Sequence, residues 1–418
     1  MNNTDFAGLA LPAFVSSTID ALADAGYEAY AVGGCVRDGL LGIEPHDWDI
    51  TTSALPDEVL TSLGERGFDV RAGAGLKHGT VTVVVDDGEK KTASEVTTYR
   101  IDGDYTDSRR PDSVSFVSDI KEDLARRDLT INAMATDGTH LIDPFGGRED
   151  LGRGIVRCVG EAEKRFTEDA LRILRALRFA ARFGYNIDKD TEKAMRTLAH
   201  RVRNISAERI AAELWGIFSA EYAGKVLPEY ADVIRTALSF DYPDTGDMFL
   251  RSDDVSVRFA LFFGNASADA AKRLKMSNAQ RRFCENALSL ASGNIPSGRA
   301  EILRAMRRYG DDLEKCLEYA GIANGEEDAA KECTDKVRTF RSSGECYNIN
   351  MLSAGGSDMI KLGYSGEMIG RVLEALLSEV IAGEIANEHD ALISEAKKIG
   401  GTDVFGKGSA EAHHSACN

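Results

Sequence analysis

The chain has few prolines, no paired cysteines and no apolar run long enough to cross a bilayer. Only 8 of its 418 residues are proline and 40 are glycine, which argues against a long disordered or fibrous segment. The seven cysteines form no C-x-x-C pair, so we expect reduced, mostly buried thiols rather than disulfides or a zinc site. Met1–Ala13 has no basic segment before an apolar core, and no apolar stretch approaches the roughly 18–20 residues of a membrane-spanning helix. We therefore expect a cytoplasmic protein without a membrane partner.

Negative charge is in excess. The formal net charge is −18, with 43% hydrophobic and 28% charged residues, which is otherwise the ordinary composition of a globular protein. A nucleic acid is repelled by a chain of this sign unless basic side chains gather locally. A length of 418 residues is too great for one compact domain, so about two to four domains are expected.

Strand signals are confined to the first 150 residues. Strands are expected at 28–32, 47–51, 79–85 and 92–99, and helices at 12–26, at 55–63 and from Val36. This pattern predicts a mixed, largely antiparallel sheet, and it lacks the regular βαβ repeat of a doubly wound fold. Beyond residue 150 only helical periodicity is found. These helices are expected at 166–183, 189–202, 206–223, 228–236, 254–264, 267–274, 277–291, 298–308, 311–321, 325–342, 365–382 and 387–398.

The first informative constellation is a glycine pair followed by two aspartates. Gly33-Gly34 lies between a predicted strand and a predicted helix, where glycines let backbone N–H groups approach a phosphate. Asp47-Trp48-Asp49 lies on the next predicted strand, so Asp47 and Asp49 project to one face while Trp48 packs behind. Two neighbouring carboxylates repel each other unless a cation lies between them, and hard oxygen ligands suit Mg²⁺. The sequence therefore predicts a magnesium site at these aspartates.

Two further segments carry candidate site residues that also have ordinary alternatives. Glu95, within a predicted strand, is a third carboxylate near the metals if it faces inward, and otherwise a surface residue of an edge strand. Arg126, Arg127 and Asn132 surround an apolar core in the segment 126–135. Arginine suits bidentate contacts to phosphate, whereas an Arg-Arg-Asp sequence by itself is more often a solvated salt-bridge cluster.

The predicted helix at 166–183 carries a stripe of arginines. At about 100° per residue, one half of the circumference of this helix holds Arg165, Asp169, Arg172, Arg175, Arg178 and Arg182. Asp169 and Arg172 are i,i+3 neighbours, which either form a helical salt bridge or present an acceptor and donors to a base edge. Because the arginines outnumber the acids of this face in a chain of net charge −18, the stripe predicts an anionic partner.

Six segments together resemble the class II tRNA nucleotidyltransferase and poly(A) polymerase family, within the polymerase-β-type nucleotidyltransferase superfamily. In chain order they are GGCVRD at 33–38, DWD at 47–49, RRDLTINAMA at 126–135, DPFGG at 143–147, RFTEDALRILRALRF at 165–179 and ISAERI at 205–210. The resemblance implies an α+β chain with a small mixed, mostly antiparallel sheet in a catalytic nucleotidyltransferase head, followed by an elongated all-α part. The implied divisions are the head at 1–150, a nucleotide-recognising neck at 151–225, a body at 226–345 and a tRNA-binding tail at 346–418.

The same resemblance implies roles for the matched residues. Asp47 and Asp49 would be catalytic and hold Mg²⁺, with Glu95 as a third catalytic carboxylate, and Asp169 and Arg172 would select CTP and ATP without a nucleic-acid template. Further nucleotide-binding residues are expected at Gly33, Gly34, Arg37, Asp38, Arg126, Arg127, Asp128, Asn132, Arg175 and Arg178. The implied reaction is attack of the tRNA 3′-OH on the α-phosphate of CTP or ATP, by a two-metal mechanism that builds the CCA end.

The expected partners are therefore tRNA, at its acceptor stem and elbow, together with CTP and ATP, while the oligomeric state is left open. Residues 102–113 look like the flexible loop that enzymes adding the final A need, and residues 363–388 look like the C-terminal segment of CCA-adding enzymes. The nearest alternatives are an A-adding enzyme or a poly(A) polymerase. A small-molecule nucleotidyltransferase is a different class, against which the long helical part and its arginine stripe argue. Intact Asp47 and Asp49 argue against a catalytically inactive RNA-binding protein.

Overall fold

A computed structural model of the chain describes residues 8–73, 75–86, 91–103 and 114–401. Its contacts divide the chain into two compact units, each with its own buried core. Unit 1 comprises Met1–Asp241 with Arg273–Met276, and unit 2 comprises Tyr242–Lys272 with Ser277–Asn418. Most of the expected flexible loop, residues 104–113, lies outside the described residues. The division into head, neck, body and tail stays a prediction.

Unit 1 begins with a seven-stranded sheet of order β3-β4-β5-β2-β1-β8-β9. Its strands are β1 Ala29–Val32, β2 Asp49–Thr52, β3 Asp69–Arg71, β4 Thr80–Asp86, β5 Lys91–Thr98, β8 Ala135–Thr136 and β9 Leu141–Ile142. β2 and β5 run parallel, and the other neighbouring strands are antiparallel. The predicted mixed, mostly antiparallel sheet is therefore confirmed. Two separate two-stranded pairs are β6 Arg100–Asp102 with β7 Val114–Phe116, and β10 Ile155–Val156 with β11 Asn186–Ile187.

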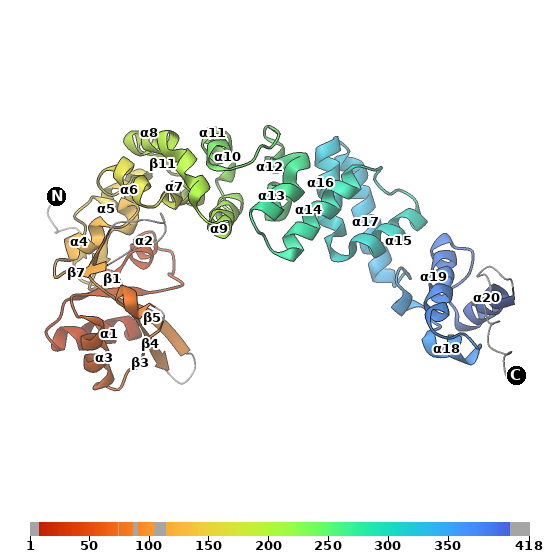
Figure 1. Cartoon of the computed structure of the whole chain (residues 1–418), viewed down its shortest axis with the longest axis horizontal. Helices are drawn as coiled ribbons and strands as arrows, with labels where there is room; N and C mark the ends of the chain where they lie inside the picture. The colour runs from red at the N-terminus through yellow and green to blue at the C-terminus, as the bar shows by residue number, and fades with distance from the viewer. Residues whose placement is uncertain (1–7, 74, 87–90, 104–113, 402–418) are drawn as a thin grey trace, which may run out of the picture. The chain divides into compact units, whose positions relative to one another are not determined.

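Short helices cover the sheet and connect its strands. They are α1 Ala13–Asp24, α2 Gly34–Leu40, α3 Pro56–Gly64, α4 Ile120–Ala125 and α5 Gly147–Arg153. α1 and α3 contact each other and the sheet (Figure 1), and α1 buries Val15 and Leu22 there. Leu124 of α4 packs with Val32 and Tyr99 in a separate apolar cluster. Apolar burial of this kind is the main force that holds short helices to a sheet.

The rest of unit 1 is mainly helical. Its helices are α6 Ala162–Glu168, α7 Leu171–Phe183, α8 Lys189–Leu198, α9 Ala207–Phe218, α10 Ala223–Glu229 and α11 Ala231–Ala237. The predicted single helix at 166–183 is wrong, because Asp169 has an extended backbone, with φ −139° and ψ 102°, between α6 and α7. The Asp169 carboxylate accepts a hydrogen bond from the Leu171 N–H at 3.0 Å. A short side chain that bonds the backbone two residues on competes with helical hydrogen bonding.

Unit 2 consists of helices and their connections in its described residues. The α-helices are α12 Val255–Phe263, α13 Ser267–Arg273, α14 Asn278–Ala291, α15 Arg299–Tyr309, α16 Leu313–Asn324, α17 Glu327–Ser343, α18 Gly356–Lys361, α19 Glu367–Ala382 and α20 His389–Gly401. Apart from α18, which is too short for a periodic pattern, they follow the predicted ranges closely. Phe263 contacts Tyr242 and Phe259 at ring-centroid distances of 4.9 and 4.7 Å, which starts the aromatic core of this unit.

Two expectations from composition agree with the structure. No helix of the described residues is both long and apolar enough to cross a membrane. Six of the seven cysteines lie in the described residues, and all six are buried and unpaired: Cys35, Cys158, Cys284, Cys316, Cys333 and Cys346.

The 3₁₀ turns include η2 Leu76–His78, η3 Thr130–Asn132, η4 Ala199–Asn204, η5 Met248–Arg251, η6 Gly264–Ala266, η7 Gly310–Asp312 and η8 Ile349–Met351.

Candidate active site

The glycine pair forms the turn between β1 and α2. Gly33 has a φ of +82°, in the left-handed region, and its N–H donates to the Met134 carbonyl at 3.0 Å. A Cβ added at Gly33 would come within 2.8 Å of Nη1 of Arg127. The backbone conformation and the neighbouring guanidinium therefore both require glycine. α2 begins at Gly34, two residues before the predicted start at Val36.

Two of the three predicted carboxylates are brought together by the parallel pairing of β2 and β5. Asp49 lies directly opposite Glu95 in this register, and β5 is an interior strand, so Glu95 is not on a sheet edge. Directly opposed residues point to the same face of a sheet. Asp49 and Glu95 are exposed, whereas Trp48 is only 7% exposed, as the predicted alternation requires.

The electrostatic surroundings of Asp49 disfavour its charged form. Although the residue is exposed as a whole, nearby protein atoms remove part of the water from its carboxyl group, and this desolvation raises its pKa. The charges of Glu95 and Asp47 raise the pKa further, and Arg127 opposes them. Asp47 lies before β2, because the observed strand begins at Asp49, two residues later than predicted. The charge of Asp47 nevertheless acts on Asp49.

These carboxylates fit a divalent cation by their chemistry. They are hard oxygen donors, and a cation relieves the mutual repulsion that raises the pKa of Asp49. Among the described residues, no group of three or more His, Cys, Asp and Glu side chains is arranged to hold a metal ion by itself. An ion at Asp47 and Asp49 would therefore complete its coordination with substrate phosphate oxygens or water.

Arg126 and Arg127 are held by a buried acid that was not predicted. Asp123 is inaccessible to solvent and accepts a hydrogen bond from Nε of Arg126 at 2.9 Å, while Nη2 of Arg127 lies 3.5 Å from its other oxygen. Thr51 of β2 donates to the same carboxylate at 3.3 Å. Burial opposes ionisation of Asp123, but the two arginines outweigh it and lower its pKa. The two arginines are thus fixed to the sheet, contrary to the alternative of a solvated cluster.

Asp128 and Asn132 form a buried hydrogen-bonded chain to two of the predicted arginines. Asp128 accepts hydrogen bonds from the Leu129 N–H at 2.8 Å, from Nδ2 of Asn132 at 3.1 Å and from Nε of Arg175 at 2.7 Å. The Asn132 carbonyl oxygen accepts a hydrogen bond from Nη1 of Arg37. Burial would raise the pKa of Asp128, but Arg175 and the Asn132 amide hold it at about 2.

Arg37 is buried between polar and aromatic groups. Its guanidinium pairs with Asp38 at 2.7 Å and lies over the rings of Phe179 and Phe183, at 4.8 and 5.3 Å from their centroids. Asp38 also accepts from Arg182 of α7 at 3.3 Å. Burial lowers the pKa of Arg37, and the charge of Asp38 opposes this effect. The turn after β1 is thereby joined to the aromatic and basic side chains of α7.

Asp169 and Arg172 are paired with other residues rather than with each other. Asp169 accepts from Nη2 of Arg209 at 2.9 Å. Arg172 is 8% exposed and donates to Glu168 at 3.3 Å and to the carbonyl of Arg126 at 2.9 Å. The predicted helical placement of this pair is therefore wrong, because the chain is extended at Asp169. Arg172 instead connects the start of α7 to the Arg126–Arg127 turn.

The arginine stripe of α7 is balanced by acids from other elements. Arg178 donates to Glu213 of α9 at 2.6 Å, and Nη1 of Arg175 lies 3.8 Å from the same carboxylate. Gly216, one turn later in α9, leaves room for Arg178, whose Cδ would lie 2.5 Å from an added Cβ. Neither Arg209 nor Glu213 was predicted from the sequence as a site residue. Glu213 could have been noticed as an acid on the apolar face of α9, where it is 8% exposed.

Comparisons with known proteins identify relatives of this chain. Residues 29–157 match the family model described as the Poly A polymerase head domain, and residues 184–231 match the probable RNA and SrmB-binding site of polymerase A. The CCA-adding enzyme of Leuconostoc mesenteroides is 36% identical over 395 residues, which are 90% of this chain and 94% of that protein. The CCA-adding enzyme of Geobacillus thermodenitrificans is 51% identical over 209 residues, 50% of this chain and 49% of that protein.

A solved structure gives the same result over nearly the whole chain. The crystal structure of the Bacillus stearothermophilus CCA-adding enzyme in complex with CTP superposes with a TM-score of 0.71 at 32% identity, covering 92% of this chain and 96% of that one. Sequence and fold therefore agree over about nine-tenths of the chain. With the glycine turn and the opposed carboxylates in the head, they show that this chain belongs to the family of CCA-adding enzymes, the class II tRNA nucleotidyltransferases.

Proposed function

We propose that this protein builds the CCA end of tRNA from CTP and ATP without a nucleic-acid template. The observation that carries the proposal is the parallel register that sets Asp49 opposite Glu95 beside the Gly33 turn. The relatives that support it are CCA-adding enzymes, one of which was solved with CTP. Partners of this chain are accordingly tRNA, CTP and ATP, and a cytoplasmic location is part of the proposal.

Nucleotidyltransferases of this family use divalent metal ions, and we assign Mg²⁺ to Asp47 and Asp49. A divalent ion held by these two carboxylates would lower the pKa of the attacking hydroxyl and would stabilise negative charge on the transferred phosphate. The oxygen of the tRNA 3′-OH attacks the α-phosphorus and its proton passes to water, while the bond from the α-phosphorus to the bridging β-phosphate oxygen breaks and pyrophosphate leaves. Arg127, beside the Gly33 turn and next to Asp49, is placed to hold the triphosphate while attack occurs.

Nucleotide selection is assigned to Asp169 and Arg172. The Asp169 carboxylate has acceptor capacity beyond its bonds to Arg209 and to the Leu171 N–H. Arg172 is held by Glu168 and by the Arg126 carbonyl. A fixed acceptor and a fixed set of donors can recognise the edge of a base, and fixation removes the entropic cost of ordering them during binding.

The direct test is extension of three tRNAs, one lacking the whole CCA end, one ending in the first C and one ending in the second C. Each is incubated with purified protein and either CTP or ATP. A CCA-adding enzyme adds two C residues from CTP and then one A from ATP. Addition of A alone would identify an A-adding enzyme, and repeated A addition would identify a poly(A) polymerase.

Gly33→Ala is expected to reduce CCA addition about tenfold or more, because the added methyl group must displace the guanidinium of Arg127 from its place. Gly42→Ala is the matched control, since Gly42 also has a positive φ, +71°, but has nothing within 4 Å of an added Cβ. Both variants should lose about 1 kcal/mol of stability from backbone strain. Equal activity of the two variants in steady-state assays would contradict the assigned role of Arg127.

Binding of tRNA should weaken steeply with salt despite the net charge of −18. Each phosphate that a basic side chain neutralises releases condensed counterions, so the affinity should fall about tenfold or more between about 50 and 200 mM salt. Fluorescence anisotropy with labelled tRNA measures the slope, and circular dichroism at both salt concentrations controls for unfolding. An affinity that does not change over this range would reject a basic RNA-binding surface.

A further inference from the structure

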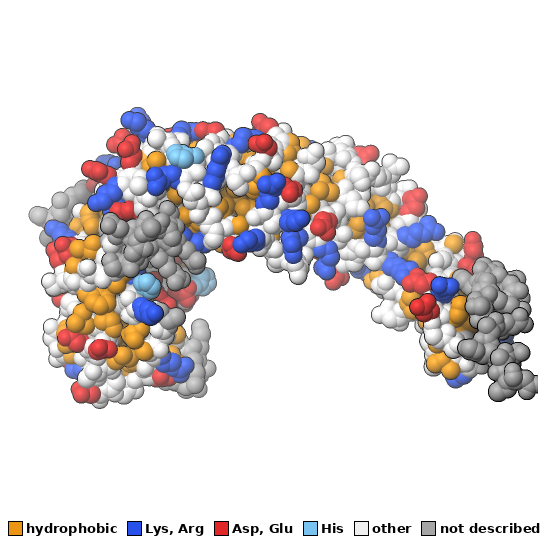
Figure 2. All heavy atoms as spheres, in the orientation of Figure 1, with side chains coloured by type: hydrophobic (Ala, Val, Ile, Leu, Met, Phe, Trp, Pro, Cys, Tyr) orange, Lys and Arg blue, Asp and Glu red, His pale blue; other side chains and the backbone are white. Residues whose placement is uncertain are grey.

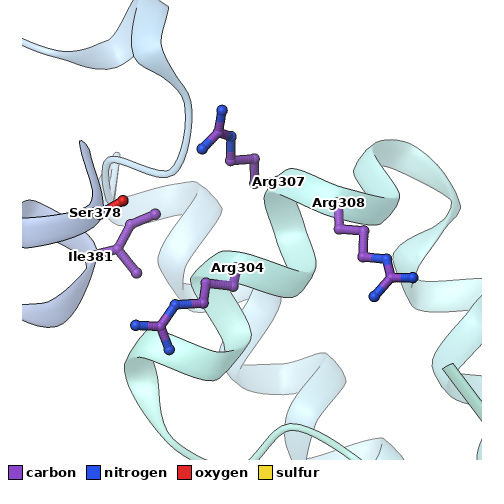
Figure 3. A pocket seen from close by; sticks show the side chains of 5 residues that line it. All are labelled: Arg304, Arg307, Arg308, Ser378 and Ile381. Carbon is purple, nitrogen blue, oxygen red and sulfur yellow. The ribbon is translucent and has the colours of Figure 1, made fainter. Parts of the chain in front are cut away.

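The arginines at the cavity between α15 and α19 of unit 2 do not converge. This cavity has a volume of about 410 Å³, and three arginines of α15 line it: Arg304, Arg307 and Arg308. The guanidinium groups of Arg304 and Arg307 point apart (Figure 3), and Arg307 pairs with Glu374 at 2.6 Å. On the visible face of unit 2, Lys and Arg side chains are interspersed with acids (Figure 2). Arg304 and Arg307 are therefore not arranged around one ligand.

Three guanidinium groups do converge in unit 1, around the ring of Phe179. The Cζ atoms of Arg178, Arg37 and Arg175 lie 4.7, 4.8 and 5.7 Å from the centroid of this ring. Phe179 belongs to α7 and is only 4% exposed. A cation within about 6 Å of an aromatic ring is attracted by the negative potential of the ring face, most strongly where water is excluded. One buried ring thus attracts three cations of the predicted nucleotide site.

The three arginines reach the ring from two elements. Arg175 lies one turn before Phe179 in α7, so these two side chains share a face of the helix. Arg37 comes from α2, and its Nη2 atom lies 3.6 Å from the position of a Cβ added at Gly34. Its guanidinium also lies over Phe183, whose ring stacks on that of Phe179 with centroids 6.1 Å apart and 8° between the planes. The two rings therefore join α7 to the glycine turn after β1.

Acids hold the same arginines through the nitrogen nearest the backbone. In each pair Nε donates to a carboxylate: Arg178 to Glu213 at 2.6 Å, Arg175 to Asp128 at 2.7 Å and Arg37 to Asp38 at 2.8 Å. Nε is only one of several N–H donors of a guanidinium, so the outer nitrogens of Arg175 and Arg178 can still donate to a phosphate or a hydroxyl. Gathering these cations has a cost, because burial, and then the charge of Arg182, lower the pKa of Arg37.

We propose that Phe179 is a positioning residue for nucleotide binding: its ring holds Arg37, Arg175 and Arg178 in the array that receives the phosphates and sugar of CTP or ATP. This inference rests on the proposed function, and it assigns no contact between the ring and the nucleotide. Groups that are already ordered lose less conformational freedom when a ligand binds, so the array raises affinity without taking part in the bond changes. Loss of the ring should therefore raise the KM for both nucleotides and leave kcat nearly unchanged.

The first arm of the test compares Phe179→Leu with Phe249→Leu in CCA addition by the full chain. Phe249 is 1% exposed in unit 2 and packs against Phe262 at a centroid distance of 5.6 Å, so its replacement also removes a ring from a buried core. Phe179→Leu should raise the KM for CTP and ATP about tenfold, with kcat within about twofold of the wild type. Phe249→Leu should leave both KM values within about twofold, although both variants should unfold at a lower temperature. A similar rise in KM in the two variants would assign the effect to lost stability and overturn the proposal.

The second arm changes the electron density of the ring and keeps its shape. Mono-, di- and trifluorinated phenylalanine are installed at position 179 alone, because each fluorine withdraws electron density from the ring face and weakens its attraction for cations. The KM for both nucleotides should rise stepwise with the number of fluorines, while the unfolding temperature stays nearly constant. A KM that does not depend on fluorination would mean that Phe179 acts by packing alone, which is the opposite of the proposal.

Calorimetric titration with CTP, without tRNA, separates this proposal from the proposed function. The Kd for CTP should rise in Phe179→Leu and along the fluorinated series even if no nucleotide is transferred. A wild-type protein that binds CTP but does not extend tRNA would contradict the proposed function, and the titrations would still decide the role of the ring. Equal CTP affinity of the wild type and folded Phe179→Leu would reject the positioning role.

Discussion

Asp49→Ala is expected to abolish nucleotide incorporation while the protein stays folded and still binds tRNA. Desolvation and the charges of Glu95 and Asp47 already raise the pKa of Asp49. Removal of its carboxylate takes away a metal ligand and with it several kcal/mol of transition-state stabilisation. The same change relieves repulsion between like charges, so the free energy of unfolding should hold or rise. Asp47→Ala should behave in the same way.

The measurement combines incorporation of labelled CTP with thermal unfolding in the presence and absence of Mg²⁺. Mg²⁺ should stabilise the wild type, since a ligand that binds only the folded state raises its unfolding temperature, and Asp49→Ala should lose this effect. Asp69→Ala is the control, because Asp69 is an exposed acid of β3 that pairs with Arg71. A variant that keeps more than about a tenth of the wild-type rate would contradict the metal assignment.

The carboxylate arrangement was only partly predictable from local patterns. Neighbouring side chains of an extended segment point to opposite faces, so Asp47 and Asp49 point away from the face on which Trp48 is buried. This part of the arrangement can be predicted without knowledge of the fold. The position of Glu95 depends on the parallel register of β2 and β5, which pairs it with Asp49. A shift of one residue in the pairing register would turn Glu95 to the opposite face of the sheet. The alternation of residues within β5 alone therefore does not determine the role of Glu95.

The break between α6 and α7 was not predictable from periodicity. Apolar side chains continue on both sides of Asp169, with Phe166 and Leu174 fully buried, so the helical pattern is uninterrupted in the sequence. The structure differs because the Asp169 carboxylate bonds the Leu171 N–H and Nη2 of Arg209. A single side chain with two partners, one of them distant in sequence, thus decides the backbone at the proposed nucleotide-recognition site.

The charge of the arginine stripe was overestimated for the same kind of reason. Counting charges along one helix omits acids that reach it from elsewhere: Asp38 from α2, Asp128 after α4 and Glu213 from α9. Arg175, Arg178 and Arg182 each pair with one of them. Free positive charge for RNA therefore has to be sought among arginines without such partners.

Asp128→Ala is expected to cost about 3 kcal/mol of stability, because it leaves the half-buried Arg175 without its acid and the buried Asn132 amide without its acceptor. Asp128 is 8% exposed and bonds Asn132 and Arg175, and through Asn132 it also positions Arg37. Asp128→Asn keeps the shape of the side chain but removes its charge. It should cost about 2 kcal/mol of stability, because the pKa of Asp128 is about 2 in the folded state and 3.8 for an ordinary aspartate. Both variants should also weaken nucleotide binding.

The pH dependence of the Asn variant gives the sharper test. A depressed pKa in the folded state means that the Asp128 charge stabilises the protein fully above about pH 4, and that this contribution is lost as the pH falls toward 2. Urea unfolding of wild type and Asp128→Asn should therefore differ most at pH 7 and converge as the pH falls to about 2. Asp232→Asn breaks an exposed pair with Arg196 and should cost less than about 1 kcal/mol at any pH. If Asp128→Asn costs no more than this control at pH 7, the buried chain from Asp128 to Arg37 does not hold the site together.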